Sequence, residues 1–290
     1  MTRYARIDDY ITQIKDILRG KSNQKAADLR KLIYKSRKIL NRHSGKQYSV
    51  DQAVEKLLHP GWIKSVARFN PDEWQDIADR MYIRARKILG NVQKPEIILY
   101  PSFQRFNGRV YEVDRTPYIA ASPDFPHTTG KNLQVLMAHE YAHFARWRKT
   151  GIPSENVPIY ACIFEEGWAT WMSIKLLPEY TLTHLFMSNL HKSIHMPDPK
   201  GGYLRWCKKH LKSIASEAAK SLNSKDHKAL GRFFQCQRFG NDNTPIRTGY
   251  YLGYRMIDML AGQMPARKLM LEKPTRRKVS GWLDQLLDQP

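Results

Sequence analysis

Apolar side chains in the first 90 residues recur at the spacing of a helix. They form two runs, Tyr10, Ile11, Ile14, Ile17 and Leu18, and then Leu29, Leu32, Ile33 and Leu40. Ser49 followed by Gln52 is typical of a capped helix start, and His59-Pro60-Gly61 ends that helix. Asn70-Pro71 opens another helix, because proline is favoured at the first helical position. The pattern therefore predicts a helical N-terminal extension over residues 1–90.

The pattern changes after Lys94-Pro95 to short runs of β-branched and aromatic residues between turn residues. Three such runs predict strands at Glu96–Tyr100, Gly108–Val113 and Pro117–Ala121. Pro117 fits best at the start of a strand or on a sheet edge, because proline lacks the N–H that a neighbouring strand needs.

Long helical patterns follow the predicted strands. One helix is expected from about residue 132 to 148, and Pro158 opens a second that runs toward Leu177-Pro178. Further helical segments follow, with breaks at residues 197–202 and 240–249. Strands followed by helices indicate an α+β fold that is mostly helical, with residues 91–290 as one domain after the N-terminal extension.

The first of these helices contains an H-E-x-x-H sequence, made by His139, Glu140 and His143. Residues four apart lie on one face of a helix, so both imidazoles can reach the same cation. Zinc accepts such ligands, and Glu140 lies where it can take a proton from zinc-bound water. The alternative is a pair of surface histidines on an amphipathic helix. The uncharged run before His139 favours a buried site, where ionisable side chains need a partner.

The next helix offers a third ligand. Glu165 and Glu166 are adjacent acids within an otherwise apolar run, and a metal ion would explain a carboxylate there. No histidine follows His143 at short spacing before Gly151 ends the first helix. The residues alone leave both acids as candidates.

These motifs resemble those of the gluzincins, zinc peptidases whose third ligand is a glutamate on a downstream helix. In aminopeptidase N-type members that segment reads N-E-G-F-A, and Glu166-Gly167-Trp168-Ala169 aligns with its last four positions. The resemblance implies that Glu166 is the ligand and Glu165 its neighbour. The spacer between His143 and Glu166 is 22 residues long, which is a few residues longer than in those enzymes. The chain also lacks their G-x-M-E-N segment, so aminopeptidase activity is not implied.

The chain is also similar to a bacterial group of predicted zinc-dependent proteases. In that group, H-E-x-x-H and E-G-x-A are followed by a G-Y-x-x-G-Y segment, which runs here from Gly249 to Tyr254. The three motifs lie between about residues 96 and 260. The resemblance implies a zincin-like fold and bound Zn2+. It also implies a zinc-dependent hydrolase, an endopeptidase acting on a protein or peptide substrate with Glu140 as general base.

Tyr250 and Tyr254 are candidate catalytic residues. Peptide hydrolysis develops negative charge on the former carbonyl oxygen, so a hydrogen-bond donor beside the metal is expected, and gluzincins often use Tyr or His. The two phenols are four residues apart on a predicted helix, and Arg247 and Arg255 are nearby alternatives. The competing interpretation is half-buried packing, with the two glycines of the segment allowing close helix contact.

The predicted strands suggest where a substrate binds. In zincin folds, an edge strand before the metal helix pairs with an extended substrate. Arg109–Val113 and Tyr118–Ala121 are the two candidates, and the sequence does not decide between them.

The chain is strongly basic, since 48 Lys and Arg against 27 Asp and Glu leave a net charge of +21. Such a surplus favours a polyanionic partner, either nucleic acid or an acidic protein, or else a well-solvated basic surface. The alternative function is a nucleic-acid-associated protein that carries a zincin-like domain and acts on DNA-bound proteins. Its basic segments would be Lys31–Lys46 and Lys268–Lys278. No helix-turn-helix, zinc-finger or RNA-binding signature accompanies them.

The cysteines and the lengths of the apolar runs indicate the cellular compartment of the protein. Cys162, Cys207 and Cys236 are far apart and form no C-x-x-C pair, which indicates a reducing compartment and argues against a cysteine-based zinc site. No run approaches the ~18–20 apolar residues of a membrane span. Asp8 and Asp9 interrupt the stretch where an export signal needs apolar residues, so a cytoplasmic location is expected. Export by another route stays open.

Overall fold

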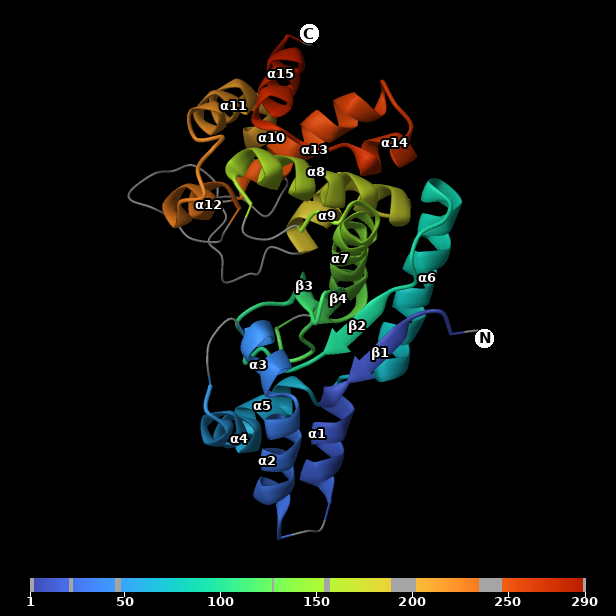
Figure 1. Ribbon diagram of the computed structural model, residues 1–290, viewed down its shortest axis with the longest axis vertical. Coiled ribbons are helices and arrows are strands. Elements are labelled where there is room, and N and C mark those ends of the chain that lie inside the picture. Colours follow the sequence, from blue (N-terminus) through green and yellow to red (C-terminus); the bar gives the residue numbers. More distant parts are fainter. Residues whose placement is uncertain are drawn as a thin grey trace. The chain divides into compact units, whose positions relative to one another are not determined.

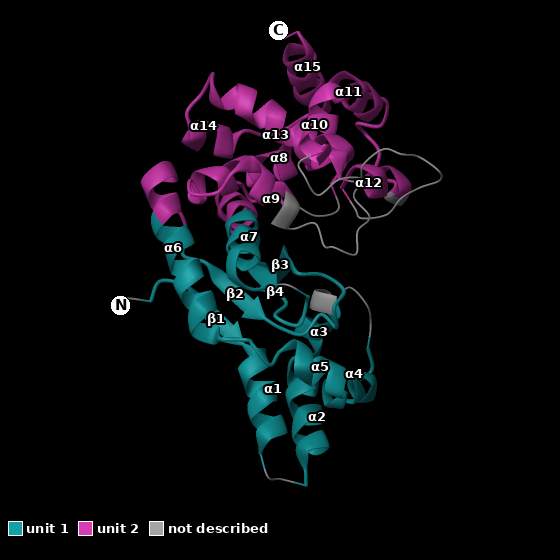
Figure 2. Cartoon of the chain, turned by 180° about the vertical axis from the view of Figure 1, so that it is seen from behind, with its two compact units in different colours: residues 1–83, 93–140 teal, residues 84–92, 141–290 magenta. Residues whose placement is uncertain are grey.

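The computed structural model describes residues 3–20, 23–44, 48–126, 128–153, 157–188, 202–234 and 247–288 (Figure 1). The chain forms two compact units, Met1–Ile83 with Gln93–Glu140, and Arg84–Val92 with Tyr141–Pro290 (Figure 2). The described residues form one four-stranded sheet and many helices, so the predicted α+β class is confirmed.

The sheet belongs to the first unit, and its strand order is β1-β2-β4-β3. The strands are β1 (Arg6–Asp9), β2 (Glu96–Leu99), β3 (Gly108–Val113) and β4 (Thr116–Ala121). β1, β2 and β4 run parallel, and β3 is antiparallel to β4. The two residues between β3 and β4, Asp114 and Arg115, have φ values of 47° and 66°, as the tight turn of a two-residue hairpin requires.

Strand β1 does not appear in the sequence pattern. Arg6–Asp9 contains a single apolar residue, so the prediction of helices alone over residues 1–90 is wrong at this segment. β1 forms because it pairs with β2 along its length, from Arg6 opposite Glu96 to Asp9 opposite Leu99. This pairing joins the N-terminal residues to residues 93–140, whereas the sequence suggested a boundary near residue 90.

The remaining helices near the N-terminus follow the predicted pattern. They are α1 (Tyr10–Arg19), α2 (Lys25–Lys35), α3 (Arg37–Ser44), α4 (Val50–Leu58) and α5 (Pro60–Ser65). Ile11, Ile14, Leu29, Ile33 and Leu40 from the predicted apolar runs are fully buried. Ser49 and Gln52 form the expected reciprocal cap at the start of α4. Local signals therefore determine these helices.

The strand order shows which of the two candidate strands lies at an edge of the sheet. β4 is bonded on both sides, to β2 and to β3, so Tyr118–Ala121 has no open edge. β3 pairs only with β4 among the described strands, so Arg109–Val113 lies at an edge of the sheet. Pro117 stands at the start of β4, before the pairing with β2 begins at Ile119, as its missing N–H requires.

Two long helices carry residues of both units. α6 (Pro71–Leu89) begins at the predicted proline. α7 (Gly130–Thr150) covers the predicted helix over residues 132–148 and extends it by two residues at each end. From Val135 to Trp147 every residue of α7 except His139 is buried, which is typical of a helix that is apolar on all sides.

The second unit is built around α8 (Ile159–Leu176). The other helices that follow are α9 (Leu182–Ser188), α10 (Gly202–Lys209), α11 (Leu211–Lys220), α12 (His227–Phe234), α13 (Thr248–Ala261), α14 (Ala266–Leu271) and α15 (Arg276–Leu287). α13 packs on α8 with Gly253 against Gly167. A Cβ added to Gly167 would lie 2.3 Å from the carbonyl carbon of Gly253, so the two backbones touch here. Glycine is therefore needed at position 253 for this close approach, in line with the packing interpretation of that residue.

No helix in the described part of the chain combines the length and the apolar character needed to cross a membrane. Cys162 and Cys207 are free thiols, and Cys236 lies outside the described residues.

Candidate metal centre

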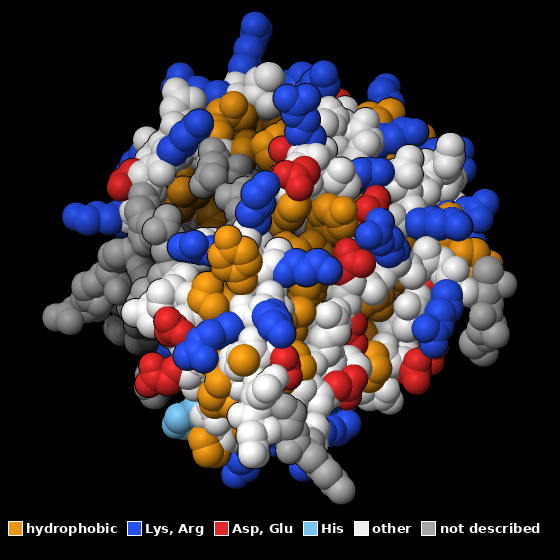
Figure 3. Space-filling model, turned by 60° about the horizontal axis from the view of Figure 1, so that its bottom comes forward, with side chains coloured by type: hydrophobic (Ala, Val, Ile, Leu, Met, Phe, Trp, Pro, Cys, Tyr) orange, Lys and Arg blue, Asp and Glu red, His pale blue; other side chains and the backbone are white. Residues whose placement is uncertain are grey.

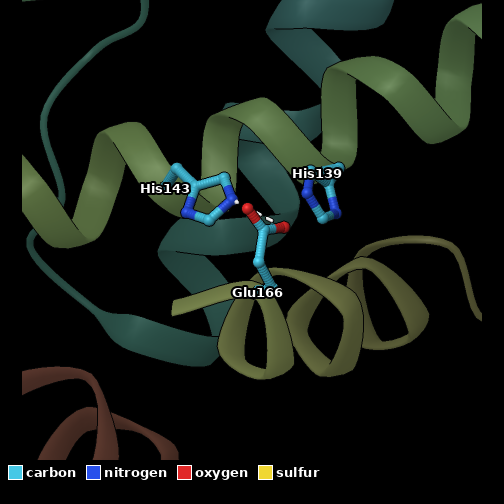
Figure 4. Close-up of side chains that lie close together, drawn as sticks. All are labelled: His139, His143 and Glu166. Atoms are coloured by element: carbon cyan, nitrogen blue, oxygen red, sulfur yellow. Dashed lines mark ion pairs between the residues drawn. The ribbon is translucent and has the colours of Figure 1, made fainter. Parts of the chain in front are cut away.

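Helices α7 and α8 bring together His139, His143 and Glu166 (Figure 4). The two imidazoles project from successive turns of α7, and the carboxylate of Glu166 points toward them from α8. One ligand atom of each residue lies within 4.8 Å of those of the other two. Nε2 of His143 is 3.5 Å from Oε2 of Glu166. The three residues that the sequence predicts as metal ligands therefore converge on one point.

The donor set fits a zinc ion that keeps one open position. Two ligands at ~2.1 Å from a tetrahedral zinc ion are about 3.4 Å apart. The distance between His143 and Glu166, 3.5 Å, is close to this value. Two imidazole nitrogens and one carboxylate are typical of catalytic zinc sites, whereas structural sites use four protein ligands. The Glu166 side chain is 20% exposed and His139 is also partly exposed, so solvent reaches the group.

Glu140 lies against the first residue of the edge strand. Its side chain is buried, and a Cβ placed on Gly108 would come within 3.2 Å of its Cγ atom. The same Cβ would lie 2.9 Å from Leu136. A larger residue at position 108 would therefore press on the side chain that the sequence predicts as the general base. Strand β3 and Glu140 are direct neighbours within the first unit.

The two adjacent acids have different surroundings. Glu165 is 2% exposed, and its two carboxylate oxygens accept hydrogen bonds of 2.9 and 3.0 Å from Nε of Arg146. Burial raises the pKa of the Glu165 carboxyl, and the positive charge of Arg146 opposes that rise. Glu165 is therefore engaged in a buried ion pair, while Glu166 is the acid that faces the histidines.

The sequence interpretation missed Arg146. This fully buried guanidinium also donates hydrogen bonds to the main-chain carbonyls of Met270 and Glu272. It lies seven residues after His139 on α7, and hence near the same face of the helix. Two features of the sequence indicate this ion pair. An arginine stands inside an apolar helix, and the next helix carries two adjacent acids where the metal needs only one.

A second polar contact joins α8 to α7. The indole N–H of Trp168 donates to the carbonyl oxygen of Ala142 at 3.1 Å. Glu165 and Trp168 stand on either side of Glu166 in the sequence, and both are bound to α7. Because both flanking contacts fix the position of α8 along α7, they determine where the Glu166 carboxylate lies.

Cys162, one turn before Glu166, is not a member of the group formed by His139, His143 and Glu166. Burial and the nearby carboxylates of Glu166 and Glu165 raise the pKa of its thiol to about 12. Its Sγ atom lies 3.6 Å from the carbonyl oxygen of Val157, as a weak donor. These surroundings suit a small side chain that packs in the protein interior.

Tyr250 and Tyr254 lie on α13 among other aromatic side chains. The ring of Tyr250 packs edge-on against Phe234, and the guanidinium of Arg247 lies 4.2 Å from its centroid. The ring of Tyr254 meets Phe186 with centroids 6.3 Å apart. These contacts are packing contacts within the second unit. A catalytic role for either phenol stays a prediction.

The two basic segments lie in different units. Residues 31–46 belong mainly to α2 and α3, with residues 45–46 outside the described part, and residues 268–278 belong to α14 and α15. On the face drawn in Figure 3, Lys and Arg side chains are spread among acidic and apolar ones. Lys278 forms an ion pair with Glu272. Binding of a polyanion stays a prediction.

Comparison with known proteins gives no match. No protein-family model, curated protein or solved structure is similar to this chain. Because a fold class alone does not determine function, the side chains of the site carry the functional interpretation.

Proposed function

We propose that this protein is a zinc-dependent endopeptidase with a zincin-like fold, whose zinc ion is held by His139, His143 and Glu166. The observation that carries the proposal is the convergence of these three ligands within 4.8 Å on α7 and α8. A zinc ion bound there would polarise the scissile carbonyl and make a water molecule acidic enough to attack it at neutral pH.

Glu140 is the general base of the proposed reaction. Its carboxylate takes a proton from the attacking water and passes it to the leaving amine. The residue is 6% exposed, and it follows directly after the ligand His139. Burial of this kind keeps bulk water away from the proton that is transferred and strengthens the electrostatic interactions at the site.

Strand β3 is the proposed binding edge for the substrate. An extended peptide would add to this edge through main-chain hydrogen bonds, which suits a protein substrate cleaved within its chain. Gly108, the first residue of β3, is in contact range of Glu140. A peptide paired with β3 would therefore lie close to the general base, Glu140.

Tyr250 or Tyr254 is the proposed donor to the oxygen that becomes negative during the reaction. Losing one such donor typically lowers kcat by roughly 10²- to 10³-fold. Tyr→Phe at the position that supplies this donor is therefore expected to lower kcat and keep the metal. If the phenols serve packing alone, the same changes lower stability and leave turnover per folded molecule unchanged.

Metal content and peptide cleavage together test the proposal. Elemental analysis after zinc reconstitution is expected to find about one zinc ion per chain. His143→Ala should lose this zinc, and His184→Ala, at an exposed histidine of α9, should keep it. Glu140→Gln should keep the zinc and lose cleavage of a broad peptide library. Glu179→Gln, at a more exposed glutamate paired with Arg84, should change neither.

Two results contradict the proposal at different points. Protein that holds no zinc after reconstitution would rule out the metal site. Protein that binds zinc at the three ligands but cleaves no peptide of the library would rule out the endopeptidase.

The alternative function, a nucleic-acid-associated protein acting on DNA-bound proteins, depends on the net charge of +21. It predicts that affinity for duplex DNA falls steeply between low and moderate salt, because each neutralised phosphate releases counterions. If no binding is detected at low salt, the basic residues form a solvated surface and do not bind DNA.

A further inference from the structure

A cavity lies within the first unit, lined by α4, α5 and the loop that follows β2. Its volume is about 550 Å³, which lies within the roughly 300–1,000 Å³ of most small-molecule sites. Three aromatic side chains form its walls: Tyr48, Trp62 and Phe103. The rings of Tyr48 and Phe103 meet edge to face, with centroids 5.1 Å apart.

A buried carboxylate holds two of these walls in place. Asp124 is fully buried and accepts hydrogen bonds from the main-chain N–H groups of Ser102 and Phe103, at 3.0 and 2.8 Å. Its second oxygen also accepts from the indole N–H of Trp62 at 3.2 Å. One carboxylate therefore ties the loop that carries Phe103 to the helix that carries Trp62. These hydrogen bonds hold the two walls together without a ligand.

The loop is held in an unfavourable backbone conformation. Phe103 and Gln104 have φ values of 53° and 62°, in the left-handed region that glycine adopts easily and other residues adopt at a cost. Two such residues in succession persist only where the surroundings impose them, and strain of this kind is concentrated at ligand sites. Here the strained pair forms part of the cavity wall, and Asp124 imposes it.

The polar groups at the rim present donors. The Nδ1 atom of His59 accepts from the amide of Gly61 at 3.1 Å, so the N–H of the neutral ring is at Nε2. The Oε1 atom of Gln52 accepts from the amide of Ser49 at 3.1 Å, which leaves the amide NH₂ as its donor group. Both acceptor atoms are thus used within the protein.

A positive charge lies over the aromatic walls. The ammonium of Lys56 is 5.7 Å from the ring centroids of both Tyr48 and Phe103. Among the lining residues that the structure describes, Glu55 is the one acid, and its charge disfavours a ligand with several negative groups. The cavity therefore combines flat apolar walls with donors and one cation, which suits a flat ligand with a single anionic acceptor group.

We propose that this cavity binds an aromatic ring that bears one carboxylate. The ring lies against Tyr48, Trp62 and Phe103, where edge-to-face and stacked arrangements are favourable. The carboxylate accepts charge-assisted hydrogen bonds from Lys56 and His59. A free aromatic acid and the C-terminal aromatic residue of a peptide share this chemistry. The proposal does not depend on the metal site or on hydrolysis.

Calorimetric titration of the full chain with indole-3-acetate tests this assignment. Tryptamine, with the same ring and the opposite charge, should bind at least about tenfold more weakly. Cyclohexylacetate, with the same charge and no aromatic ring, should also bind more weakly. A peptide that ends in phenylalanine with a free carboxylate, compared with its amidated form, distinguishes the two sources. Whichever acid binds more tightly, the free one or the peptide, identifies the source.

Matched lysine variants locate the binding. Lys56→Gln keeps most of the side-chain length and should lower affinity by at least about tenfold, because a charged hydrogen bond is lost. Lys64→Gln, at an exposed lysine of α5 outside the lining, should leave affinity unchanged. Both positions are exposed, so both variants should fold, which circular dichroism checks.

Three outcomes overturn the proposal. The first is absence of binding of both acids at millimolar concentration. The second is binding of tryptamine or cyclohexylacetate as tight as that of indole-3-acetate. The third is unchanged affinity in Lys56→Gln.

Discussion

Glu165 and Asp124 are both buried carboxylates that hold a site together, but they are stabilised in different ways. Glu165, in the second unit, faces the guanidinium of Arg146, so a charged partner on another helix compensates its charge. Asp124, in the first unit, accepts several hydrogen bonds from neutral donors of nearby loops and helices. A buried ion pair depends on both members being present, whereas several neutral donors share the compensation. The two regions should therefore respond differently to the loss of one group.

The largest effect is expected when Arg146 is removed. Arg146→Met leaves Glu165 as a buried charge without its partner, which typically costs about 3–5 kcal/mol of stability. Arg146→Met with Glu165→Met removes the unpaired charge as well and should regain part of that loss, because the carbonyls of Met270 and Glu272 still lack their donor. Arg30→Met breaks an exposed ion pair with Asp51 and should cost less than about 1 kcal/mol. Urea unfolding of the four proteins, wild type included, measures these differences.

A loss below about 1 kcal/mol in Arg146→Met would contradict this comparison. It would mean that the surroundings neutralise Glu165 without the guanidinium.

Substitutions of the two adjacent acids, Glu165 and Glu166, should lower zinc affinity to different extents. Glu166→Gln removes a charged ligand and should lower zinc affinity by about a hundredfold or more, which corresponds to about 2.7 kcal/mol. Glu165→Gln changes only a residue that positions α8, so it should lower affinity by about tenfold or less. Competition with a zinc-chelating dye measures both. The reverse order would show that Glu165, and not Glu166, is the ligand.

A smaller loss of stability is expected at Asp124. Asp124→Asn keeps the shape and one acceptor oxygen, but an NH₂ group then faces one or more of the donors. Leaving a buried donor unsatisfied typically costs about 1–3 kcal/mol. Urea unfolding should show a loss below that of Arg146→Met, because the remaining oxygen still accepts. A loss of stability as large as that in Arg146→Met would show that the two carboxylates do not differ in how they depend on their partners.

The smallest effect is a gain in stability at the strained loop. Gln104 is exposed and has φ of 62°, so Gln104→Gly relieves the backbone without removing a buried contact. Glycine should raise stability by about 1 kcal/mol, and Gln104→Ala should not. The melting temperatures of the two variants test this. Equal stability of both variants would show that the backbone of the loop is not strained at Gln104.

The prediction of the metal centre depended on regular spacing. His139 and His143 meet because four residues make about one helical turn, which holds for any helix at this place. The same local regularity made α4 and α7 predictable almost to their ends, and the short β-branched runs indicated β2, β3 and β4. These features depend on residues close together in the sequence, so the sequence alone was sufficient to predict them.

Contacts between distant residues decided the rest. β1 exists because Arg6–Asp9 pairs with β2, not because its own residues favour a strand. The choice of β3 as the open edge depends on the strand order.

Arg146 is buried because Glu165 and the carbonyls near residue 271 come to it from other helices. The strained cavity loop depends on a carboxylate that lies 21 residues after Phe103. The sequence determined which helices carry the candidate metal ligands. Only the tertiary structure decided which acid faces the histidines and which edge lies beside Glu140, because packing fixes the direction of a side chain that local preference leaves open.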